Sequence, residues 1–520
     1  MSSDIAVSIV IPVYNVAAYL QETLDSVAGQ TFEDFEVILM DDGSSDGSAD
    51  IAKAFAGRDS RFRYVRKDNE GVSVTRNRAI ELAKGRYLLL VDSDDILPEG
   101  ALESLYRAAE DNEADVVTGK LMHLRDGVYT TVRMSEMVFS GYRHRTTMKE
   151  SPGLAFDSIT CGKLIRRAFW DGLGLKFPAG LSYCEDMPLA FRLYANAKTV
   201  IMLDETVYLW RVRGEESRSA TQSISMRMIE ERLTSLRMID DIIREEGVGA
   251  GIVRQKKMKS LLMDFNILVN KIVDMEDEEM DRAMSLIGGY MKEDGLAEEF
   301  RNIPVIYAEK YRALMKGDRD RLRKLRAFQT DRQSSIICRR AGKKILGVFP
   351  SAILPLRVAD MKSSVAAEPL RLRVKTVTAA DGRITAGGCA YIRYLPVREP
   401  RDVKMSAWIK DGDRERVRQL RIEQCPTKTP FGIEKKSNSN RVAYAGAGYV
   451  ITVAKEDFAG LRPGSYRIFI EWEACGEKRE AAIYPFNEEQ IGEITGSRIL
   501  EGAVSSIGSS LRKEPIFTVG

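Results

Sequence analysis

Histidine is almost absent from this sequence. Its 520 residues include two histidines, His123 and His144, and six cysteines that lie far apart without Cys-x-x-Cys spacing. Structural zinc and iron–sulfur sites need clustered thiolates and imidazoles, so this pattern argues against both. The glycine motifs of dinucleotide-binding folds and of P-loop proteins are also missing from the expected positions, which argues against dinucleotide chemistry and phosphoryl transfer.

Long apolar runs and an excess of one charge are lacking too. No apolar run approaches the roughly 18 residues of a membrane span. With 78 basic and 76 acidic residues the formal net charge is +2, so net charge alone would not hold a nucleic acid or a membrane. The first residues, MSSDIAVSIVIPVYN, lack the basic region of a signal peptide. We therefore expect a cytoplasmic protein, with any membrane contact peripheral, at the inner face of the cell membrane.

What the sequence does contain is a run of alternating strand and helix patterns at its beginning. Short β-branched segments at residues 7–15, 35–42, 62–67 and 87–95 alternate with amphipathic segments at 16–30, 48–57 and 73–85. This order predicts an α/β domain with a mostly parallel sheet that binds a nucleotide. Ligands of such sheets lie beyond the carboxyl ends of the strands, where two aspartate clusters of this chain would then meet.

The rest of the chain changes character twice. Composition, at 44% hydrophobic residues, allows about two to four globular domains. After about residue 220 the pattern is helical with no strand signal until about residue 365, and short alternating strands then predict a β-sandwich of immunoglobulin-like size. We predict a catalytic domain, a helical linker domain, a β-sandwich for oligomerisation or glycan binding, and a C-terminal tail that shows no pattern, at residues 1–225, 226–364, 365–490 and 491–520.

The aspartates after the fourth strand suit a divalent cation. In a strand, the first and third residues of Asp-x-Asp project in the same direction, so Asp92 and Asp94 are expected to converge on one ligand. Mg²⁺ and Mn²⁺ are commonly held by one or two carboxylates, with water and substrate phosphates completing the shell. The metal would neutralise a departing diphosphate as a Lewis acid. The alternative is that these are turn residues without a ligand.

Five segments taken together resemble the family 2, GT-A type glycosyltransferases. They are VSIVIPVYN, MDDGSSDGS, NEGVSVTRNRAI, GRYLLLVDSDD and CEDMPLAFRL, and the resemblance covers about residues 5–220. It implies a GT-A fold, a UDP-sugar donor and inversion at the anomeric carbon. By matching positions, the residues of the nucleotide site are Pro12, Tyr14, Asp41, Asp42, Asn69, Arg76, Asp92 and Ser93, and the metal ligands are Asp94 and Asp92.

An inverting transfer also needs a base that removes the proton of the acceptor hydroxyl. The segment YCEDMPLAFRL supplies Glu185 and Asp186. The resemblance makes Asp186 the base and Glu185 an orienting or sugar-binding group, whereas an acidic helix N-terminus is the alternative. Farther on, Arg211, Arg213 and Arg218 lie in a segment that either closes on the diphosphate or is a surface loop.

The acceptor is suggested by a narrower resemblance. DSDDILPEGALESLYRAAEDNEADVVTGK and FPAGLSYCEDMPLAFRL are similar to bacterial enzymes that add a hexose or N-acetylhexosamine to wall teichoic acid, some of which form trimers through C-terminal β-sandwiches. This implies a polymeric or lipid-linked acceptor and a homo-oligomer. The basic residues between Lys310 and Lys344 would contact such a polyanion, or else form a solvated helix. The alternatives are a capsule or exopolysaccharide transferase, and a non-catalytic carbohydrate-binding or scaffold protein.

Overall fold

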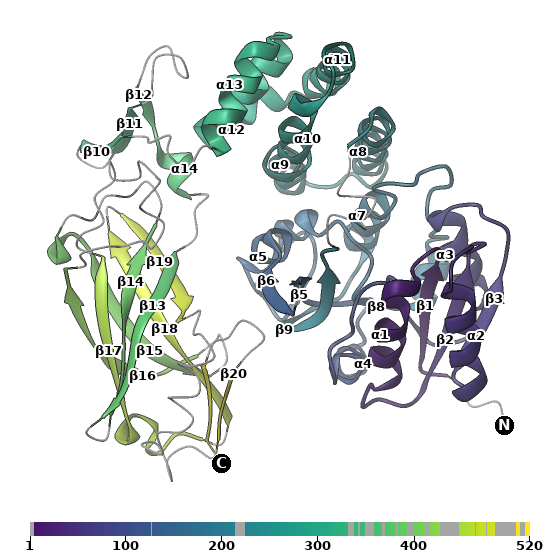
Figure 1. Cartoon of the computed structure of the whole chain (residues 1–520), viewed down its shortest axis with the longest axis horizontal. Coiled ribbons are helices and arrows are strands. Elements are labelled where there is room, and N and C mark those ends of the chain that lie inside the picture. Colours follow the sequence, from purple (N-terminus) through teal and green to yellow (C-terminus); the bar gives the residue numbers. More distant parts are fainter. Residues whose placement is uncertain are drawn as a thin grey trace. The chain divides into compact units, whose positions relative to one another are not determined.

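The chain divides into two compact units, Met1–Leu268 and Val269–Gly520 (Figure 1). This computed structural model describes residues 5–125, 127–213, 224–330, 337–341, 344–348, 358–366, 370–380, 383–392, 395, 397, 399–411, 415–426, 447–462, 464–474, 476–483, 506–509 and 515–519. In this described part of the chain, no helix has both the length and the apolarity needed to cross a bilayer.

The first unit is built on one mixed sheet. Its main path runs in the order β3-β2-β1-β4-β8-β5-β9-β7, with β6 paired to β5. The first four strands are parallel to one another, and β8 is antiparallel to both β4 and β5. The strands are β1 Val7–Val13, β2 Phe35–Asp41, β3 Phe62–Arg66, β4 Tyr87–Leu90, β5 Val116–Arg125, β6 Val128–Thr131, β7 Arg145–Thr146, β8 Lys163–Arg166 and β9 Val200–Arg211.

Helices connect and flank these strands. From β1 the chain adds β2 and β3 on one side and then crosses back to add β4 on the other side of β1. Right-handed crossovers therefore place α1 and α2 on one face of the sheet and α3 on the other. The helices are α1 Ala17–Ala28, α2 Ser48–Arg58, α3 Val72–Leu82, α4 Ala101–Asn112, α5 Arg133–Phe139, α6 Arg167–Gly172, α7 Asp186–Asn196, α8 Met226–Glu246, α9 Ala250–Lys259 and α10 Phe265–Lys271. A 3₁₀ turn, η1 Pro152–Phe156, and a π-helical turn, η4 Ser260–Asp264, complete the unit.

The helices and strands that the sequence periodicity predicts are confirmed in this unit. Helix α1 buries Leu20, Leu24 and Val27, which share one face at helical spacing, and it ends before Gly29 as expected. Strand β1 is buried along almost its whole length, as expected for a central parallel strand covered on both faces. The predicted GT-A-like α/β domain with a mostly parallel sheet is therefore present.

The second unit begins with helices, as predicted. They are α11 Asp277–Glu293, α12 Val305–Met315 and α13 Arg319–Thr330, followed later by the short α14 Lys362–Ala366. Two basic residues of the predicted polymer-contacting stretch pair within the unit: Arg321 pairs with Glu309 and Arg323 with Asp277. Lys310 is buried, donates to Asn270 and Gln329, and has its pKa lowered to about 7 because burial disfavours its charged form. Lys310 is therefore not a residue that can meet a polymer in this conformation.

Strands appear earlier than the sequence predicted. Strands β10 Ile337–Ala341, β11 Lys344–Val348 and β12 Val358–Asp360 form a small antiparallel sheet. The expectation of helix without strand up to residue 364 is wrong for this stretch. The local mixture of basic and apolar residues gives no strand pattern. The strands form because they pair with one another, which local sequence does not reveal. The boundaries of the predicted linker domain stay a prediction.

The remaining strands form one antiparallel sheet that curls back on itself. Its path is β13-β14-β17-β16-β15-β18-β21-β20, with β19 paired to β18. Trp472 on β18 is buried and donates to the Ala390 carbonyl on β14 over 3.1 Å, which joins strands from distant parts of the path. The strands are β13 Arg371–Ala380, β14 Arg383–Tyr391, β15 Lys404–Asp411, β16 Glu415–Cys425, β17 Gly448–Ala454, β18 Gly464–Ala474, β19 Glu477–Ala482, β20 Ser506–Ser509 and β21 Pro515–Val519.

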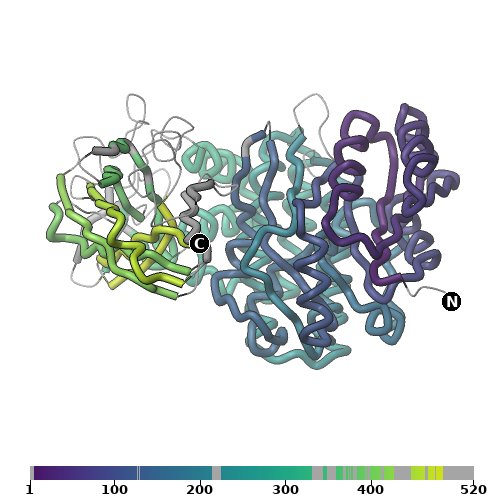
Figure 2. Tube along the Cα trace, turned by 90° about the horizontal axis from the view of Figure 1, so that it is seen from below, coloured from purple at the N-terminus to yellow at the C-terminus, as the bar shows by residue number. Residues whose placement is uncertain are grey.

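Segments far apart in the sequence are therefore neighbours in this sheet. Figure 2 shows the green and yellow parts of the trace side by side, in keeping with the pairing of β14 with β17 and of β15 with β18. The predicted β-sandwich is confirmed as a near-barrel. Strands β20 and β21 come from the tail in which the sequence shows no pattern, and β21 pairs with β18.

A glycine beside strand β9 provides a test of packing in the first unit. Gly162 has a φ of +69°, and a Cβ there would lie 2.8 Å from Cβ of the buried Tyr208. Gly162→Ala should lower the free energy of unfolding by about 2 to 4 kcal/mol, because a left-handed backbone and an overlap both disfavour the methyl group. Thermal and chemical denaturation would measure this loss.

The matched control is Gly174→Ala. Gly174 has a φ of +59°, but a methyl group added there would meet no atom within 4 Å, so only the backbone cost of about 1 kcal/mol applies. Equal losses in both variants would contradict the close approach of Gly162 to Tyr208.

Candidate active site

The carboxyl ends of β1, β2 and β4 meet at one edge of the first sheet. Strand β1 lies between β2 and β4, so the strand order reverses there, which is where open parallel sheets place their ligands. Pro12 lies near the end of β1, and Tyr14, which follows the strand, is 51% exposed. Asp41 ends β2, and Asp42 comes directly after it. The structure therefore places the two sequence clusters of aspartates at the same edge of the sheet; that they line one nucleotide-binding crevice stays a prediction.

Asp41 and Asp42 are occupied by contacts within the protein. Asp41 accepts from the Tyr64 hydroxyl over 2.6 Å and from the Ser44 amide over 2.8 Å. Burial acts to raise its pKa, but these hydrogen bonds outweigh burial and the pKa lies below its ordinary value. Asp42 accepts from the amides of Glu70 and Gly71, each over 2.9 Å, and also pairs with Lys67. Both carboxylates thus shape the loops of the crevice.

Asn69 lies on the exposed loop between β3 and α3. Its backbone runs close to Gly43: a Cβ on Gly43 would lie 3.2 Å from the Asn69 nitrogen, and Gly43 has a φ of +79°. Glycine is needed there because the loops after β2 and β3 touch at that point. Asn69 is thereby held beside Asp42 at the rim of the crevice.

The second cluster lies in a turn, not in a strand. Strand β4 ends at Leu90, and the Asp95 amide donates to the Asp92 carbonyl over 3.1 Å. The argument that strand alternation points Asp92 and Asp94 the same way is therefore wrong, because turn-forming Asp and Ser end the strand early. The turn is held by the Tyr208 hydroxyl, which accepts from the Asp92 amide over 3.0 Å, and by Thr23, which donates to the Ser93 carbonyl over 3.0 Å.

Asp94 is paired with an arginine at the end of β9. Arg213 Nε and Nη2 lie 2.7 and 2.6 Å from Asp94 Oδ2. Arg211 donates to the Asp94 carbonyl over 2.7 Å, and its amide donates to the Asp95 carboxylate over 2.7 Å. Both guanidinium groups lie about 5 Å from the Tyr19 ring, at 5.4 and 5.2 Å. Arg218, predicted in the same segment, lies outside the described residues.

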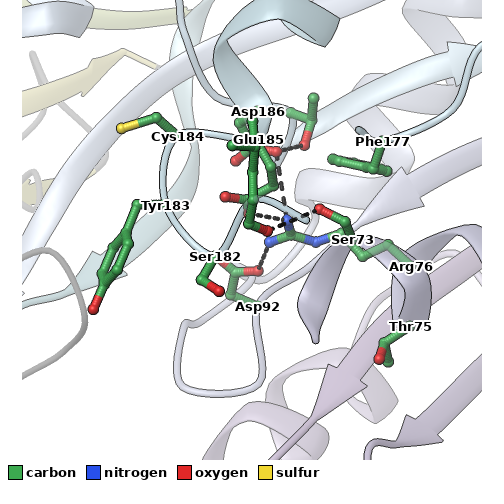
Figure 3. A network of polar contacts seen from close by, with 12 residues as sticks. Ser73, Thr75, Arg76, Asp92, Phe177, Ser182, Tyr183, Cys184, Glu185 and Asp186 are labelled. Carbon is green, nitrogen blue, oxygen red and sulfur yellow. Dashed lines mark hydrogen bonds and ion pairs between the residues drawn. The ribbon is translucent and has the colours of Figure 1, made fainter. Parts of the chain in front are cut away.

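A buried arginine joins the aspartate turn after β4 to the acid pair Glu185 and Asp186. Arg76 on α3 has a side chain only 4% exposed, and its guanidinium lies among carboxylates from two other segments (Figure 3). Its Nη2 donates to Asp92 over 2.7 Å, its Nη1 donates to Glu185 over 2.5 Å, and Nη1 lies 3.6 Å from Asp186. The Phe177 ring centroid is 5.1 Å away. Arg76 was predicted as a nucleotide contact, and this bridging position was not predicted.

Burial and the balance of charges in this cluster raise the pKa values of its acids Glu185 and Asp186. One guanidinium faces three carboxylates, so it cannot compensate all of them. Burial raises the pKa of Glu185 to about 7, although Arg76 opposes the shift, and the negative charge of Asp186 adds to it. Burial also raises the pKa of Asp186. The two acids begin helix α7, whose dipole favours their ionised form, but burial outweighs the dipole.

Several contributors to the site carried no sequence signal. Thr160 donates to Asp186 Oδ1 over 2.5 Å, and Tyr208 supports the turn at Asp92. Thr160 lies in an irregular segment and Tyr208 in an apolar strand, so neither stands out by motif or spacing. The carboxylate of Asp92 is the most open of the three acids around Arg76, at 37% exposed.

The donor atoms suit a hard divalent cation. Asp92 and Asp94 lie in one turn, and burial raises the pKa of Asp94 although Arg213 opposes the shift, which indicates a carboxylate short of positive charge. Among the described residues no three acidic, cysteine or histidine side chains gather as a ready-made metal site. A metal would therefore need oxygen atoms from the substrate, and Arg213 would have to leave Asp94.

Sequence comparison places the first unit among glycosyltransferases. Residues 8–173 match the family described as glycosyl transferase family 2. Glycosyltransferase GlyG of Streptococcus pneumoniae is 32% identical over 217 residues, 40% of this chain and 71% of that protein. The uncharacterized glycosyltransferase EpsJ of Bacillus subtilis is 33% identical over 208 residues, 39% of this chain and 60% of EpsJ.

A further relative has a named polymer in its description. The poly(ribitol-phosphate) beta-glucosyltransferase of Bacillus spizizenii is 30% identical over 214 residues, which are 40% of this chain and 32% of that protein. The chain thus spans less than two thirds of the length of this relative and of EpsJ.

Solved structures extend the likeness in fold. S. aureus TarS 1-349 in complex with UDP-GlcNAc superposes with a TM-score of 0.53 at 20% identity, covering 66% of this chain and 97% of that one. S. aureus TarS covers 99% of this chain and 85% of its own, with a TM-score of 0.52 at 15% identity. At these identities the likeness concerns the fold, a GT-A-like domain and a C-terminal antiparallel sheet. The match of residues 8–173 to the family and the match to most of GlyG show that this chain belongs to glycosyl transferase family 2.

Proposed function

We propose that the protein is an inverting glycosyltransferase that moves a sugar from a UDP-sugar to a hydroxyl of a bacterial cell-surface polymer, with wall teichoic acid as the acceptor. The observation that carries the proposal is the cluster in which Arg76 joins Asp92, at the nucleotide crevice, to the acid pair Glu185 and Asp186. A donor site and a base thereby lie around one guanidinium.

The donor is proposed to lie along the ends of β1, β2 and β4. Tyr14 offers an exposed ring for the uracil, and the loops shaped by Asp41, Asp42 and Asn69 surround the ribose. Asp94 and Asp92 would hold Mn²⁺ or Mg²⁺, which would supply Lewis-acid stabilisation of the diphosphate leaving group. Arg211 and Arg213, at the end of β9, would then bind diphosphate oxygens.

The acceptor proton is proposed to go to Asp186. Thr160 holds Oδ1 of this carboxylate, so Oδ2 is the atom that we assign to proton transfer. Glu185 is bound by Arg76 and orients the pair. A single base working opposite the leaving group gives inversion, because no covalent glycosyl intermediate has to form.

The proposed acceptor rests on the names of relatives, and the proposed assembly rests on the sequence resemblance alone. The name of the poly(ribitol-phosphate) beta-glucosyltransferase supports hexosyl transfer to teichoic acid, and the UDP-GlcNAc bound in a TarS structure of like fold supports N-acetylhexosaminyl transfer as the other choice. We further propose a cytoplasmic enzyme at the inner face of the membrane, and a homo-oligomer, with three subunits, formed by the C-terminal sheet. Acceptor assays with teichoic acid against a lipid-linked saccharide separate this proposal from polysaccharide synthesis.

The first test is donor turnover by the purified protein. UDP release from a panel of UDP-sugars with Mn²⁺ or Mg²⁺ should depend on acceptor polymer, and Asp186→Ala should lower kcat by about 100-fold or more because the base is lost. Asp94→Ala should abolish the metal dependence. The matched control is Asp171→Ala, an exposed carboxylate on α6. Glycan binding without any turnover would favour a non-catalytic protein instead.

The acid pair predicts an unusual pH profile. A carboxylate base works only when ionised, so a raised pKa moves the loss of activity to higher pH. We expect kcat/KM to be constant at alkaline pH and to fall as pH drops through about 7, the pKa of Glu185 in this coupled pair. In Glu185→Gln, Arg76 faces two carboxylates instead of three, so the fall in kcat/KM should move to lower pH. If the kcat/KM of the wild type fell only at the pH of ordinary carboxyl pKa values, the raised pKa values of this acid pair would be contradicted.

Arg213 and the metal are expected to compete for Asp94. Removing Arg213 removes the cation that pairs with this carboxylate, so Arg213→Ala should bind Mn²⁺ about tenfold more tightly without nucleotide. Electron paramagnetic resonance of free Mn²⁺ measures this affinity. Arg78→Ala, which removes an exposed pair with Glu70, is the control, and Asp94→Asn should bind least. Equal affinity in Arg213→Ala and wild type would contradict the competition.

A further inference from the structure

The loop that leads into the acid pair is held in an unusual conformation. Cys184, directly before Glu185, has a φ of +61°, a region that non-glycine residues rarely adopt. Such a conformation is unfavourable and persists only where neighbouring contacts fix it. In Figure 3 the side chains of Tyr183 and Cys184 point away from Arg76, so the loop turns between Cys184 and Glu185 to direct the acids to the cluster.

The contacts that fix this loop come from one face of helix α8. Glu231 Oε2 accepts from the Ser182 amide over 2.7 Å and from the Tyr183 amide over 2.8 Å. Ser235 Oγ donates to the Cys184 carbonyl over 2.9 Å. Glu231 and Ser235 are four residues apart, so they lie one above the other on the same face of α8. Three consecutive residues before Glu185 are thus bound through their backbones.

Helix α8 is itself fixed by a buried charge cluster on the next helices. Arg232 Nη1 donates to Asp264 Oδ1 over 3.0 Å, and Lys259 Nζ donates to the same oxygen over 2.9 Å. All three side chains are buried, and Asp264 lies in the π-helical turn η4. Breaking a buried pair is strongly unfavourable, so these contacts give α8 a defined position. The position of α8 then sets that of the loop.

We propose that Glu231 and Ser235 are positioning residues that hold the backbone of residues 182–184 and thereby place Glu185 and Asp186 around Arg76. Helix α8 then belongs functionally to the active site, although its sequence predicts a linker. The role in transfer rests on the proposed function. It acts on the acid pair and not on the nucleotide crevice, whose residues come from β1, β2 and β4.

The test compares Glu231→Ala and Ser235→Ala with variants on the same helix. Glu245→Ala removes a carboxylate of α8 that pairs with Arg192, and Thr234→Ala removes the hydroxyl next to Ser235. In Glu231→Ala we expect kcat to fall by about 10- to 100-fold, because a small displacement of a catalytic group has a large effect. The donor KM should stay within about threefold, because donor binding is not involved.

A second readout does not depend on catalysis. The Ser182 and Tyr183 amides should exchange with deuterium faster in Glu231→Ala than in wild type, because their acceptor is gone. Glu231→Gln keeps an acceptor oxygen, so its amide exchange rates and its kcat should both return to wild-type values. If the negative charge of Glu231 were what mattered, Glu231→Gln would behave like Glu231→Ala. Glu245→Ala and Thr234→Ala should match wild type.

The outcomes separate the two proposals. Unchanged kcat and unchanged exchange in Glu231→Ala and Ser235→Ala would overturn the positioning role. A parallel loss of melting temperature, donor affinity and kcat in both variants would also overturn it, since that indicates general destabilisation. If wild type turns over no donor, the proposed function fails, while the exchange experiment still decides whether α8 holds the loop.

Discussion

The site depends on burying one guanidinium among three carboxylates. Arg76 comes from α3, Asp92 from the turn after β4, and Glu185 and Asp186 from the start of α7. Leaving any of these charges buried alone would cost several kcal/mol, so the three segments stabilise one another's position. Burial works against the charged guanidinium, but the carboxylates outweigh it and hold the pKa of Arg76 above its ordinary value. The cation is permanent, and only the acids are left to exchange protons.

This arrangement explains why the fold needs more than the parallel strands. Arg76 and Asp92 lie in the β–α part that resembles a simple nucleotide-binding sheet. Glu185 lies far along the chain, after the antiparallel strand β8, and its loop is bound by α8. On our proposal the sheet edge binds the donor, whereas the acids that serve the acceptor follow a loop held by α8 from outside the sheet. The first compact unit accordingly includes α8 and α9.

The sequence predicted local elements well and long-range contacts poorly. Strands and helices from Val7 to Leu90 follow from periodicity and from glycine at helix ends, because each depends on neighbouring residues. The link between Arg76 and Glu185 joins residues 109 apart, and no local pattern carries it. The apolar residues before the aspartates at 92–95 predict a strand that includes them, but turn formers prevailed. Strands β10 to β12 were not predicted because strand pairing, and not local composition, decides their structure.

The contacts of Arg76 and Arg213 indicate which side chain can change partner if a donor binds as proposed. Asp92 and Asp94 each face a guanidinium, that of Arg76 and that of Arg213 respectively. Arg76 is enclosed and holds other acids, so it cannot leave without exposing them. Arg213 lies two residues beyond the end of β9 and contacts the Asp94 carboxylate and the Tyr19 ring, and its side chain is 21% exposed, against 4% for Arg76. On our proposal, Arg213 is therefore the group that changes partner, from Asp94 to the diphosphate. With the proposed metal beside Asp94 and Arg213 beside the diphosphate, each anion would keep a positive charge next to it. A low-dielectric site requires this.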